Sequence, residues 1–408
     1  MKRLLQINIE VNYGSTGRIA EEIGQMAIAS GWESYIAYGR QENLSTSELI
    51  KVGNTFDTYW HLLQTRLLDR HALASIKATK RLIKEIEKIK PSIIQLHNIH
   101  GYYINIEVLF SYLTKSGIPV VWSLHDCWAM TGHCTHFELV GCEKWKTECQ
   151  NCPQIQSYPT SLFRDRSTKN HILKKKLFTD QSNLTLVPVS NWLGDLVDES
   201  FLTNHHKRVI QNGIDTELFS PKLDFSFRKK HNVLDKFLIL GVASVWTKIK
   251  GWDDLLSISK ELADDEVIVM VGLNEKQLKS LPANIIGLQR TRNIQELIEL
   301  YTTSDVFVNL TYADTFPTTN LEALSCGTPI ITYRTGGSVE SVTPETGLII
   351  EQGSLTELLK ALRTIKKKGK EYYTASCVRN AKQMFNKNDK YKEYLELYNE
   401  LIVSSGTE

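Results

Sequence analysis

The chain has 408 residues, of which 42% are hydrophobic and 23% are charged, and its formal net charge is +2. This length predicts two domains, because a single domain usually holds about 100–200 residues. The small net charge argues against nucleic-acid binding by bulk electrostatics, and no apolar stretch approaches the ~20 residues that a membrane-spanning helix needs.

The N-terminal segment Met1–Asn8 carries two basic residues and then an apolar run, as a signal peptide does. The run stops at Gln6, so it is shorter than the apolar region of about 7–15 residues in a secretion signal. The segment therefore predicts a first β-strand and a cytoplasmic protein. In a reducing cytosol, the seven cysteines are not expected to form structural disulfides.

Short runs rich in Val and Ile alternate with longer helical patterns along the chain. These runs are the predicted strands, at residues 4–9, 34–38, 92–96, 120–124, 184–189, 237–242, 267–271, 284–288, 306–310, 329–333 and 347–350. Nearly continuous apolar strands between helices indicate parallel sheets covered on both faces. The fold class is therefore α/β, with two Rossmann-like doubly wound domains, whose ligands bind beyond the carboxyl ends of the strands.

The boundary between the two domains is predicted near Asn212-Gly213, where a strand gives way to a turn and Pro221 closes the segment. We predict an N-terminal, acceptor-side domain over residues 1–208 with a cysteine-rich insertion at 127–153, a C-terminal domain over 209–385, and a last helix over 386–408 that packs back on the N-terminal domain.

Two features of the first half have a functional and a structural interpretation. Gly14 and Gly17 follow the first strand, where glycine lets the backbone approach a ligand closely; the alternative is a tight βα turn. The helical pattern over residues 76–89 has an apolar side and a basic side, which suits a peripheral contact with the inner face of a membrane. An ordinary surface helix over a sheet is the more common arrangement.

His125 ends the predicted strand 120–124, and His97 and His100 follow the preceding strand, where we expect them to be structural. The next segment holds four closely spaced thiols, Cys134, Cys142, Cys149 and Cys152. A Cys-x2-Cys pair is a common half-site for zinc, so the four thiols predict a structural zinc. Substitute ligands are Cys127, His133 and His136, and the alternative is a set of reduced, buried thiols.

The segment Thr311–Pro329 follows the strand 306–310 and carries the sharpest signal in the second half. Pro317 suits the first turn of a helix, which would leave the N–H groups of Phe316, Thr318 and Thr319 directed at a phosphate. Glu322, one turn further in, could reach ribose hydroxyls. The alternative is an ordinary βα unit with surface carboxylates.

The spacing from Asp314 to Glu322, with Gly-Thr-Pro after it, resembles the Glu-x7-Glu motif of glycosyltransferase family 4. The segment Asn212–Phe219 and the pair Lys250-Gly251 also resemble parts of that family, in the expected order. This resemblance implies the GT-B fold, in which two Rossmann-like domains face a cleft and the second holds the donor. Within the family, the chain is similar to transferases of bacterial capsule and exopolysaccharide synthesis, of the colanic-acid type.

The resemblance also implies roles for single residues. Glu322 should bind the donor ribose, Asp314 the donor sugar, and Lys250 the leaving diphosphate, which the N–H groups of Phe316, Thr318 and Thr319 also bind. Gly14 and Gly17 should line the active-site loop, and His125 should contact the donor sugar. Two departures stand out: the family usually has Glu at position 314 and Arg at position 245, where this chain has Val245, so Lys248 is the candidate for the missing positive charge.

The expected function is a retaining, hexosyl-type transferase (EC 2.4) that moves a sugar from a UDP- or GDP-sugar to a saccharide or lipid-linked acceptor. Fixed cations and helix N–H groups stabilise the charge that develops on the leaving diphosphate, so no cofactor is required for catalysis. The alternatives are a nucleotide-sugar-binding protein of the same fold that has lost catalysis, or another GT-B enzyme such as an epimerase.

Overall fold

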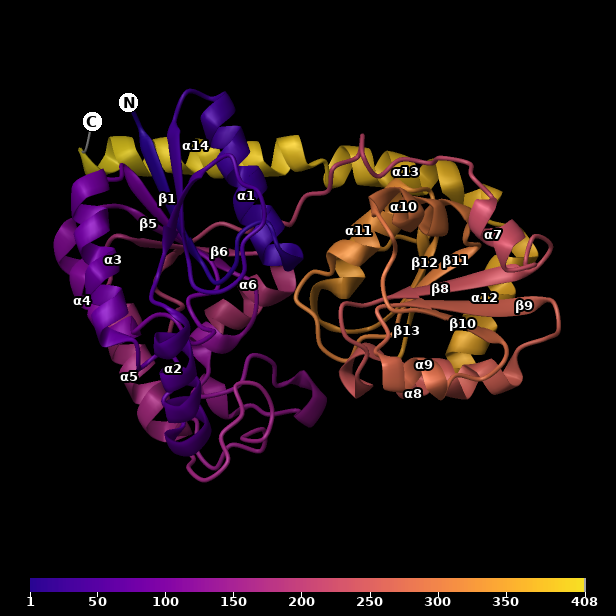
Figure 1. The fold of residues 1–408 in the computed structure, drawn as a ribbon, viewed down its shortest axis with the longest axis horizontal. Helices are drawn as coiled ribbons and strands as arrows, with labels where there is room; N and C mark the ends of the chain where they lie inside the picture. The colour runs from indigo at the N-terminus through magenta and orange to yellow at the C-terminus, as the bar shows by residue number, and fades with distance from the viewer. Residues whose placement is uncertain (407–408) are drawn as a thin grey trace. The chain divides into compact units, whose positions relative to one another are not determined.

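The computed structural model describes residues 1–406 and divides the chain into two compact units (Figure 1). The first unit holds Met1–Gln211 together with the chain from Asn388 onward, and the second holds Asn212–Lys387. The chain therefore leaves the first unit once and returns to it for its last helix.

The first unit is built on a seven-stranded parallel sheet in the order β3-β2-β1-β4-β5-β6-β7. Its strands are β1 Arg3–Asn8, β2 Glu33–Tyr38, β3 Glu48–Lys51, β4 Ile93–Leu96, β5 Val120–Leu124, β6 Leu184–Pro188 and β7 His206–Lys207. Every residue of β4, β5 and β6 is buried, as expected for central strands with helices on both faces.

Most helices of the first unit lie between successive strands along the chain. The helices are α1 Gly14–Ala29, α2 Thr55–Leu68, α3 Ile76–Ile89, α4 Ile106–Ser116, α5 Ser167–Thr179, α6 Asn191–Asp198 and α14 Lys387–Ser405, with the short 3-10 turns η1 Trp128–Met130, η2 Glu138–Val140 and η3 Lys144–Lys146. The helix predicted over 76–89 is α3, which buries Leu82 and Ile86 and is an ordinary surface helix on its apolar side.

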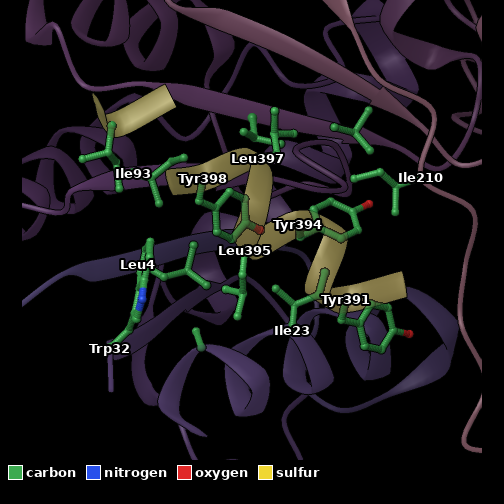
Figure 2. Packing of buried hydrophobic residues seen from close by; sticks show 14 of the residues in the cluster. Leu4, Ile23, Trp32, Ile93, Ile210, Tyr391, Tyr394, Leu395, Leu397 and Tyr398 are labelled. Carbon is green, nitrogen blue, oxygen red and sulfur yellow. The ribbon is translucent and has the colours of Figure 1, made fainter. Parts of the chain in front are cut away.

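The C-terminal helix α14 belongs to the core of the first unit (Figure 2). Its side chains Tyr391, Tyr394 and Tyr398 are almost completely buried beside apolar residues of the sheet and of α1. The buried hydroxyls have partners: Ser123 Oγ donates to the Tyr394 hydroxyl over 3.1 Å, and the Tyr398 hydroxyl donates to Gln95 of β4. Because buried polar groups need hydrogen bonds, these contacts fix the helix in one register.

The second unit has a six-stranded parallel sheet in the order β10-β9-β8-β11-β12-β13. Its strands are β8 Phe237–Val242, β9 Glu266–Val271, β10 Ile285–Leu288, β11 Val306–Asn309, β12 Ile330–Tyr333 and β13 Gly347–Ile350. Its helices are α7 Ser226–Lys230, α8 Trp252–Ile258, α9 Glu275–Lys279, α10 Ile294–Thr303, α11 Thr318–Ser325, α12 Leu355–Lys368 and α13 Glu371–Met384, with the 3-10 turns η4 Lys248–Lys250, η5 Ser259–Glu261 and η6 Gly336–Ser341.

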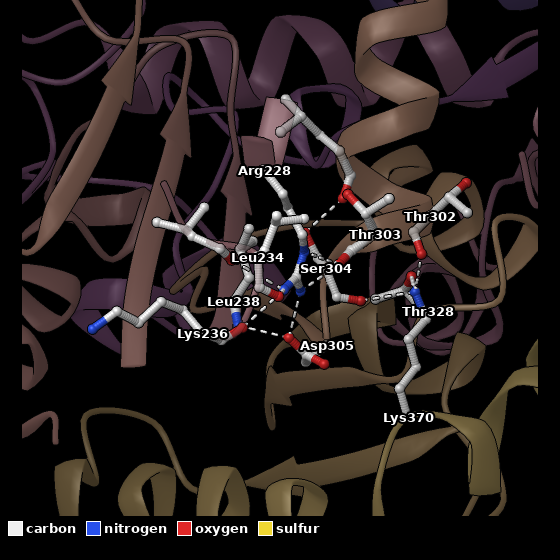
Figure 3. A network of polar contacts seen from close by, with 12 residues as sticks. Arg228, Leu234, Lys236, Leu238, Thr302, Thr303, Ser304, Asp305, Thr328 and Lys370 are labelled. Carbon is white, nitrogen blue, oxygen red and sulfur yellow. Dashed lines mark hydrogen bonds and ion pairs between the residues drawn. The ribbon is translucent and has the colours of Figure 1, made fainter. Parts of the chain in front are cut away.

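A buried polar network closes the amino ends of the central strands β8 and β11 (Figure 3). The Arg228 guanidinium donates to the carbonyl oxygen of Thr303 and lies 2.7 Å from Asp305, whose carboxylate also accepts the backbone N–H of Leu238. Lys370 Nζ donates to the Ser304 carbonyl over 2.7 Å, and burial lowers the pKa of Lys370 to about 8. The network satisfies this end of the sheet internally, so the opposite, carboxyl end is the one left for a ligand.

Membrane-spanning helices are not found in the described part of the chain, since none of its helices combines the length and the apolar character that crossing requires.

Candidate active site

The loops after β8 and β11 contact each other at the carboxyl end of the second sheet. The backbone N–H of Tyr312 donates to the Ile249 carbonyl over 2.7 Å. Between η4 and α8, Gly251 has a φ of +75°, and a Cβ at this position would lie 2.5 Å from the Leu310 carbonyl oxygen. A side chain is therefore excluded on two grounds, backbone conformation and space. The predicted Lys250-Gly251 pair is held against the loop that carries Asp314.

This contact brings two predicted site residues together. Lys250 Nζ lies 2.7 Å from Asp314 Oδ2 and 3.5 Å from Thr311 Oγ1. Both side chains keep access to solvent, so the pair contributes little to stability. Its consequence is local: the carboxylate fixes the position of an ammonium group that has three N–H donors and retains capacity for an anionic ligand.

The helix α11 begins directly after this loop and presents free N–H groups. Its N-cap residue is Pro317, which has no side-chain capping hydrogen bond. The first-turn N–H groups of Thr318 and Thr319 are the kind that have no partner within a helix. The preceding residue, Phe316, is buried, and its carbonyl accepts a hydrogen bond from Asn212 Nδ2 over 3.1 Å. A helix N-terminus with open N–H groups can bind an anion, and such binding at α11 stays a prediction.

Glu322 lies one turn into α11 and is buried. The Tyr301 hydroxyl, from α10, donates to its Oε2 over 2.9 Å. The neighbouring Asn320 is also buried: its side-chain oxygen accepts from Asn309 Nδ2 over 2.9 Å and its Nδ2 donates to Ser341 Oγ over 3.0 Å. These contacts lock the first turn of α11 against β11 and η6.

Sequence reasoning missed Tyr301 and Asn320, as well as the turn η6. The N–H of Gly337, in η6, donates to the Asp314 carbonyl over 3.2 Å, so this turn also supports the site loop. The pair Gly336-Gly337, shortly after β12, was the sequence feature that could have predicted this turn. Lys248, two residues before Lys250, is exposed to solvent. Its ammonium forms no ion pair with any of residues 1–406.

In the first unit, the two predicted glycines have structural reasons. Gly14 has a φ of +62° where α1 begins. Gly17 lies against the preceding loop: a Cβ there would be 3.2 Å from the Asn12 nitrogen, and the Asn12 N–H donates to the Gly17 carbonyl over 3.0 Å. The loop after β1 is therefore a tight turn in this structure, and a contact with a ligand stays a prediction.

His125, at the end of β5, is oriented by His97. The two rings stack with a centroid distance of 5.3 Å, and His97 Nδ1 lies 3.0 Å from His125 Nε2. The Gln6 amide donates to the Ala20 carbonyl and so directs its oxygen at His97 Nε2, 3.0 Å away. His97 must then donate through Nε2 and accept through Nδ1, which assigns the proton of His125 to Nε2. Burial lowers the pKa of His125 to about 4, so the ring is neutral at pH 7.

The adjacent Asp126 is ionised. His100 Nε2 lies 2.8 Å from its Oδ2, and the Trp128 N–H donates to its Oδ1 over 2.9 Å. Although burial acts to raise it, the pKa of Asp126 falls to about 2 because His100 and this N–H favour the carboxylate. The predicted thiols Cys134, Cys142, Cys149 and Cys152 lie in the loop that follows and line one small pocket there.

Two family models together match most of the chain. The model described as "Glycosyltransferase Family 4" matches residues 16–218, and "Glycosyl transferases group 1" matches residues 224–384. The chain belongs to glycosyltransferase family 4. The enzyme is thus a glycosyltransferase, and its two parallel sheets are the two Rossmann-like domains of the GT-B fold.

Curated relatives and solved structures agree with this membership. The family 4 chain is 23% identical over 371 residues to the colanic acid biosynthesis glycosyl transferase named WcaC of Escherichia coli (strain K12), over 88% of this chain and 89% of that protein. Its fold is similar to that of sucrose-phosphate synthase from Thermosynechococcus elongatus, with a TM-score of 0.75 and 15% identity over 99% of this chain and 100% of the other. The HepE protein of Anabaena, solved in complex with UDP-glucose, has a TM-score of 0.68 and 15% identity over 98% of this chain and 100% of the other.

Proposed function

We propose that this glycosyltransferase is a retaining, hexosyl-type enzyme that takes a sugar from a UDP- or GDP-sugar for the synthesis of a cell-surface polysaccharide. The observation that carries the donor site is the grouping of Lys250, the open first turn of α11 and the buried Glu322 at one end of the second sheet. A cation, backbone donors and a carboxylate are the groups that a nucleoside diphosphate requires.

In this proposal the diphosphate lies at the N-terminus of α11, where Thr318, Thr319 and Phe316 offer N–H groups. Glu322 accepts the ribose hydroxyls, and the Tyr301 hydroxyl holds its carboxylate in place. The solved complexes of HepE with UDP and UDP-glucose support a nucleotide-sugar ligand for this fold. Lys248 lies close along the chain and supplies further positive charge to the donor.

Lys250 has the central role in the chemical step. As the glycosyl–phosphate bond breaks, negative charge builds up on the diphosphate, and a fixed ammonium stabilises that charge more in the transition state than in the ground state. Asp314 keeps the ammonium in place and offers its second oxygen to hydroxyls of the sugar. No cofactor is required for this step. His125 contacts the donor sugar as a neutral ring, a role that rests on the family resemblance.

The acceptor in this proposal is a saccharide or a lipid-linked saccharide, and the enzyme works in the cytoplasm at the inner face of the membrane. The name of the relative WcaC, a colanic acid biosynthesis glycosyl transferase, supports a polysaccharide product. The second candidate is a protein of the same fold that binds nucleotide sugars without transfer; Asp314 and Val245, which depart from the family pattern, favour it. A third is another GT-B enzyme, such as an epimerase.

A donor screen followed by a turnover assay tests the proposal. Thermal unfolding is measured with UDP- and GDP-sugars; a bound donor at 100 times its dissociation constant adds about 2.7 kcal/mol to the free energy of unfolding. The stabilising donor is then incubated with the protein, with and without saccharide acceptors, and release of nucleoside diphosphate is followed as the sugar passes to the acceptor or to water. Binding with no release favours the non-catalytic candidate, a new nucleotide sugar favours the epimerase, and no binding of any donor contradicts the donor site.

A further inference from the structure

The four thiols Cys134, Cys142, Cys149 and Cys152 gather in a loop that regular structure does not hold. Between β5 and α5 the chain forms only the short turns η1, η2 and η3. Its apolar centre consists of the buried Trp128, Met130, Phe137 and Trp145, with Phe137 stacked on Trp145 at a centroid distance of 4.8 Å. Three of the four thiols are only partly buried, so they add little apolar packing. The part of the loop that carries these three thiols therefore needs another source of order.

The surroundings of the thiols suit thiolates bound to a metal. All four line one small pocket. The Gly132 N–H donates to Cys149 Sγ over 3.2 Å, the Gln154 N–H donates to Cys152, and the thiols of Cys134 and Cys152 are hydrogen-bonded to each other. Backbone donors to cysteine sulfur are the outer-shell contacts that orient metal ligands.

A buried lysine beside the pocket supplies the balancing charge. Lys174 is buried, and its Nζ donates to the carbonyl oxygens of Trp128 and Thr131 over 2.7 and 2.9 Å. Among residues 1–406 no carboxylate forms an ion pair with it. A buried cation normally requires an anionic partner, and a zinc ion held by four thiolates carries two negative charges.

We propose that Cys134, Cys142, Cys149 and Cys152 bind one structural Zn²⁺. Four Zn–S bonds form, and the four thiols release their protons to solvent. Four protein ligands leave no open coordination position, so the ion does not take part in sugar transfer. Its role is to order the loop that follows His125 and Asp126 in the sequence. A second set, Cys127, His136 and Glu138, has ligand atoms within 4.8 Å of one another. It offers only three ligands and one sulfur, whereas four thiols supply the closed shell of a structural zinc. In the structure no three of the four thiols have their sulfur atoms within that 4.8 Å limit, so zinc binding would draw the sulfurs together.

The zinc content of the full chain, purified without chelator, tests this proposal. About one zinc per chain is expected, and Cys149→Ser and Cys152→Ser should each lose most of it. The matched control is Cys377→Ser, a buried cysteine of the second unit, which should keep the ion. Wild-type protein without zinc, or zinc lost from Cys127→Ser and His136→Ala but kept in Cys149→Ser, overturns the assignment.

Cobalt keeps the test decisive if a cysteine variant does not fold. Wild-type protein, stripped of zinc and loaded with Co²⁺, should show the thiolate-to-cobalt absorption and the intense visible bands of a tetrahedral four-sulfur site. Weak visible bands of a six-coordinate ion, or spectra with a single thiolate, would contradict the four-thiol set. Donor binding by the second unit is measured in parallel, so loss of zinc and failure of the proposed transferase function are separate results.

A different observation points to a lipid surface: the helix α2 is arranged with its apolar side outward. Phe56, Tyr59, Trp60, Leu63 and Leu67, at i, i+3, i+4, i+7 and i+11, form one stripe and are between 37% and 75% exposed. The residues that α2 buries are His61 and Thr65. An apolar stripe normally faces the core, so this helix has the reverse of the usual arrangement.

Polar anchors hold α2 in this orientation. The Ala72 N–H donates to His61 Nε2 over 2.9 Å, which leaves Nδ1 to donate to Ser75 Oγ over 2.8 Å. The Asn54 side chain and Asp57 form a capping box at the N-terminus of the helix. With both ring nitrogens of His61 satisfied inside the unit, rotation of the helix would leave buried polar groups without partners.

Basic side chains flank the apolar stripe. The neighbouring helix α3 exposes Lys77, Lys80, Arg81 and Lys84, and Arg81 forms an ion pair with Asp57 of α2 over 3.1 Å. Near the C-terminal end of α2, the Leu162 N–H donates to the Arg66 carbonyl over 2.7 Å. This hydrogen bond holds the exposed Leu162 and Phe163 next to the helix, so they extend the apolar stripe. Exposed aromatic and aliphatic side chains beside lysines match the acyl boundary and the anionic headgroups of a membrane.

We infer that the α2 stripe, Phe56, Tyr59, Trp60, Leu63 and Leu67, docks this enzyme on an anionic lipid surface. The inference deepens the proposed function, because a lipid-linked acceptor is reached at such a surface. Its test needs neither donor nor acceptor, so its failure is distinguishable from failure of transfer.

Vesicle flotation of the full chain measures the docking. Vesicles of equal parts phosphatidylglycerol and phosphatidylcholine should bind the protein, and binding should weaken with salt. Trp60→Gln together with Leu63→Gln should lower the partition coefficient by about a hundredfold, roughly tenfold for each apolar side chain removed from lipid. The matched control, Leu223→Gln on the second unit, also removes an exposed leucine and should leave binding unchanged.

Two results overturn the lipid surface. In one, the double variant binds vesicles as the wild type does. In the other, vesicles do not bind, and sedimentation velocity shows that the wild type self-associates while the double variant is a monomer, which makes the stripe an interface between copies of the chain.

Discussion

The ammonium of Lys250 is held 2.7 Å from the carboxylate of Asp314, although 64 residues separate them in the sequence. The contact depends on the close approach of Gly251 to Leu310 and on the hydrogen bond from Tyr312 to Ile249. Asp is one methylene shorter than the Glu that the family motif usually has. In this chain the shorter side chain faces the lysine, so its first task is to position the charge that the leaving diphosphate meets.

Replacing Lys250 should slow transfer with little effect on folding. For Lys250→Met we expect kcat to fall by about a hundred- to a thousand-fold, the range found when one preorganised donor to a developing anion is removed. The unfolding midpoint should hardly move, because the ion pair is partly exposed. The exposed Lys276→Met on α9 is the control with the same change in charge. A variant at position 250 with wild-type kcat would place the leaving group elsewhere.

Glu322 should act on donor affinity, and Tyr301 should act through it. Glu322→Ala is expected to abolish measurable donor binding and transfer while the fold persists. Tyr301→Phe removes only the hydroxyl that donates to Glu322 and should raise the donor dissociation constant by about fivefold, the equivalent of one hydrogen bond of about 1 kcal/mol. Calorimetric titration of both variants with the donor measures the two effects. Equal affinity in Glu322→Ala and wild type is the contrary result.

The sequence predicted both sheets because their central strands are uninterrupted apolar runs. It missed β3, whose residues are mostly exposed, and β7, which has only two residues, because such edge strands carry no apolar pattern. The motif also placed Lys250 and Asp314 in loops that follow strands, and Glu322 in the helix after the second of these loops. Their contacts with one another and with Tyr301 depend on strand order and on turns, which a single sequence does not specify.

Two other features lie beyond what periodicity can predict. His97 and His125 meet because β4 and β5 are neighbours in the sheet, a pairing that the sequence leaves open. In α2, Phe56, Trp60 and Leu63 have the spacing that is usual for a buried stripe, yet the structure exposes them and buries His61. The hydrogen bonds that reverse this helix come from Ala72 and Ser75, which belong to the following turn.

Buried histidines should make the stability of the first unit depend on pH. Burial lowers the pKa of His61 to about 3 and that of His125 to about 4, from an ordinary value of 6.5. Between these values and pH 6.5 the unfolded chain binds more protons than the native chain, so the free energy of unfolding falls as the pH is lowered through this window. Above pH 6.5 the two rings are neutral in both the native and the unfolded chain, so their contribution to the free energy of unfolding is fully present.

Urea unfolding of the full chain measures this dependence at two pH values. One is pH 7.5, about one unit above the ordinary histidine pKa of 6.5, and the other is pH 5, more than about one unit below it. The midpoint should be lower at pH 5. His61→Asn cannot be protonated, so its midpoint should be lower than that of the wild type at pH 7.5 but should change less between the two conditions. An unchanged wild-type midpoint would mean that these rings do not lose protons on folding.

The stereochemistry of the product tests the proposed retaining mechanism. Retention is part of the proposed function, and the neutral ring of His125, with its proton on Nε2 and a pKa near 4, is a poor base for activating an acceptor at neutral pH. An α-linked donor sugar should therefore give an α-linked product. Proton NMR of fresh product reads the anomeric configuration directly, and the donor identified in the thermal screen is the one to use. A β-linked product from an α-linked donor requires attack from the face opposite the leaving group. It would exclude the retaining mechanism, while the role of Lys250 at the leaving diphosphate would still apply.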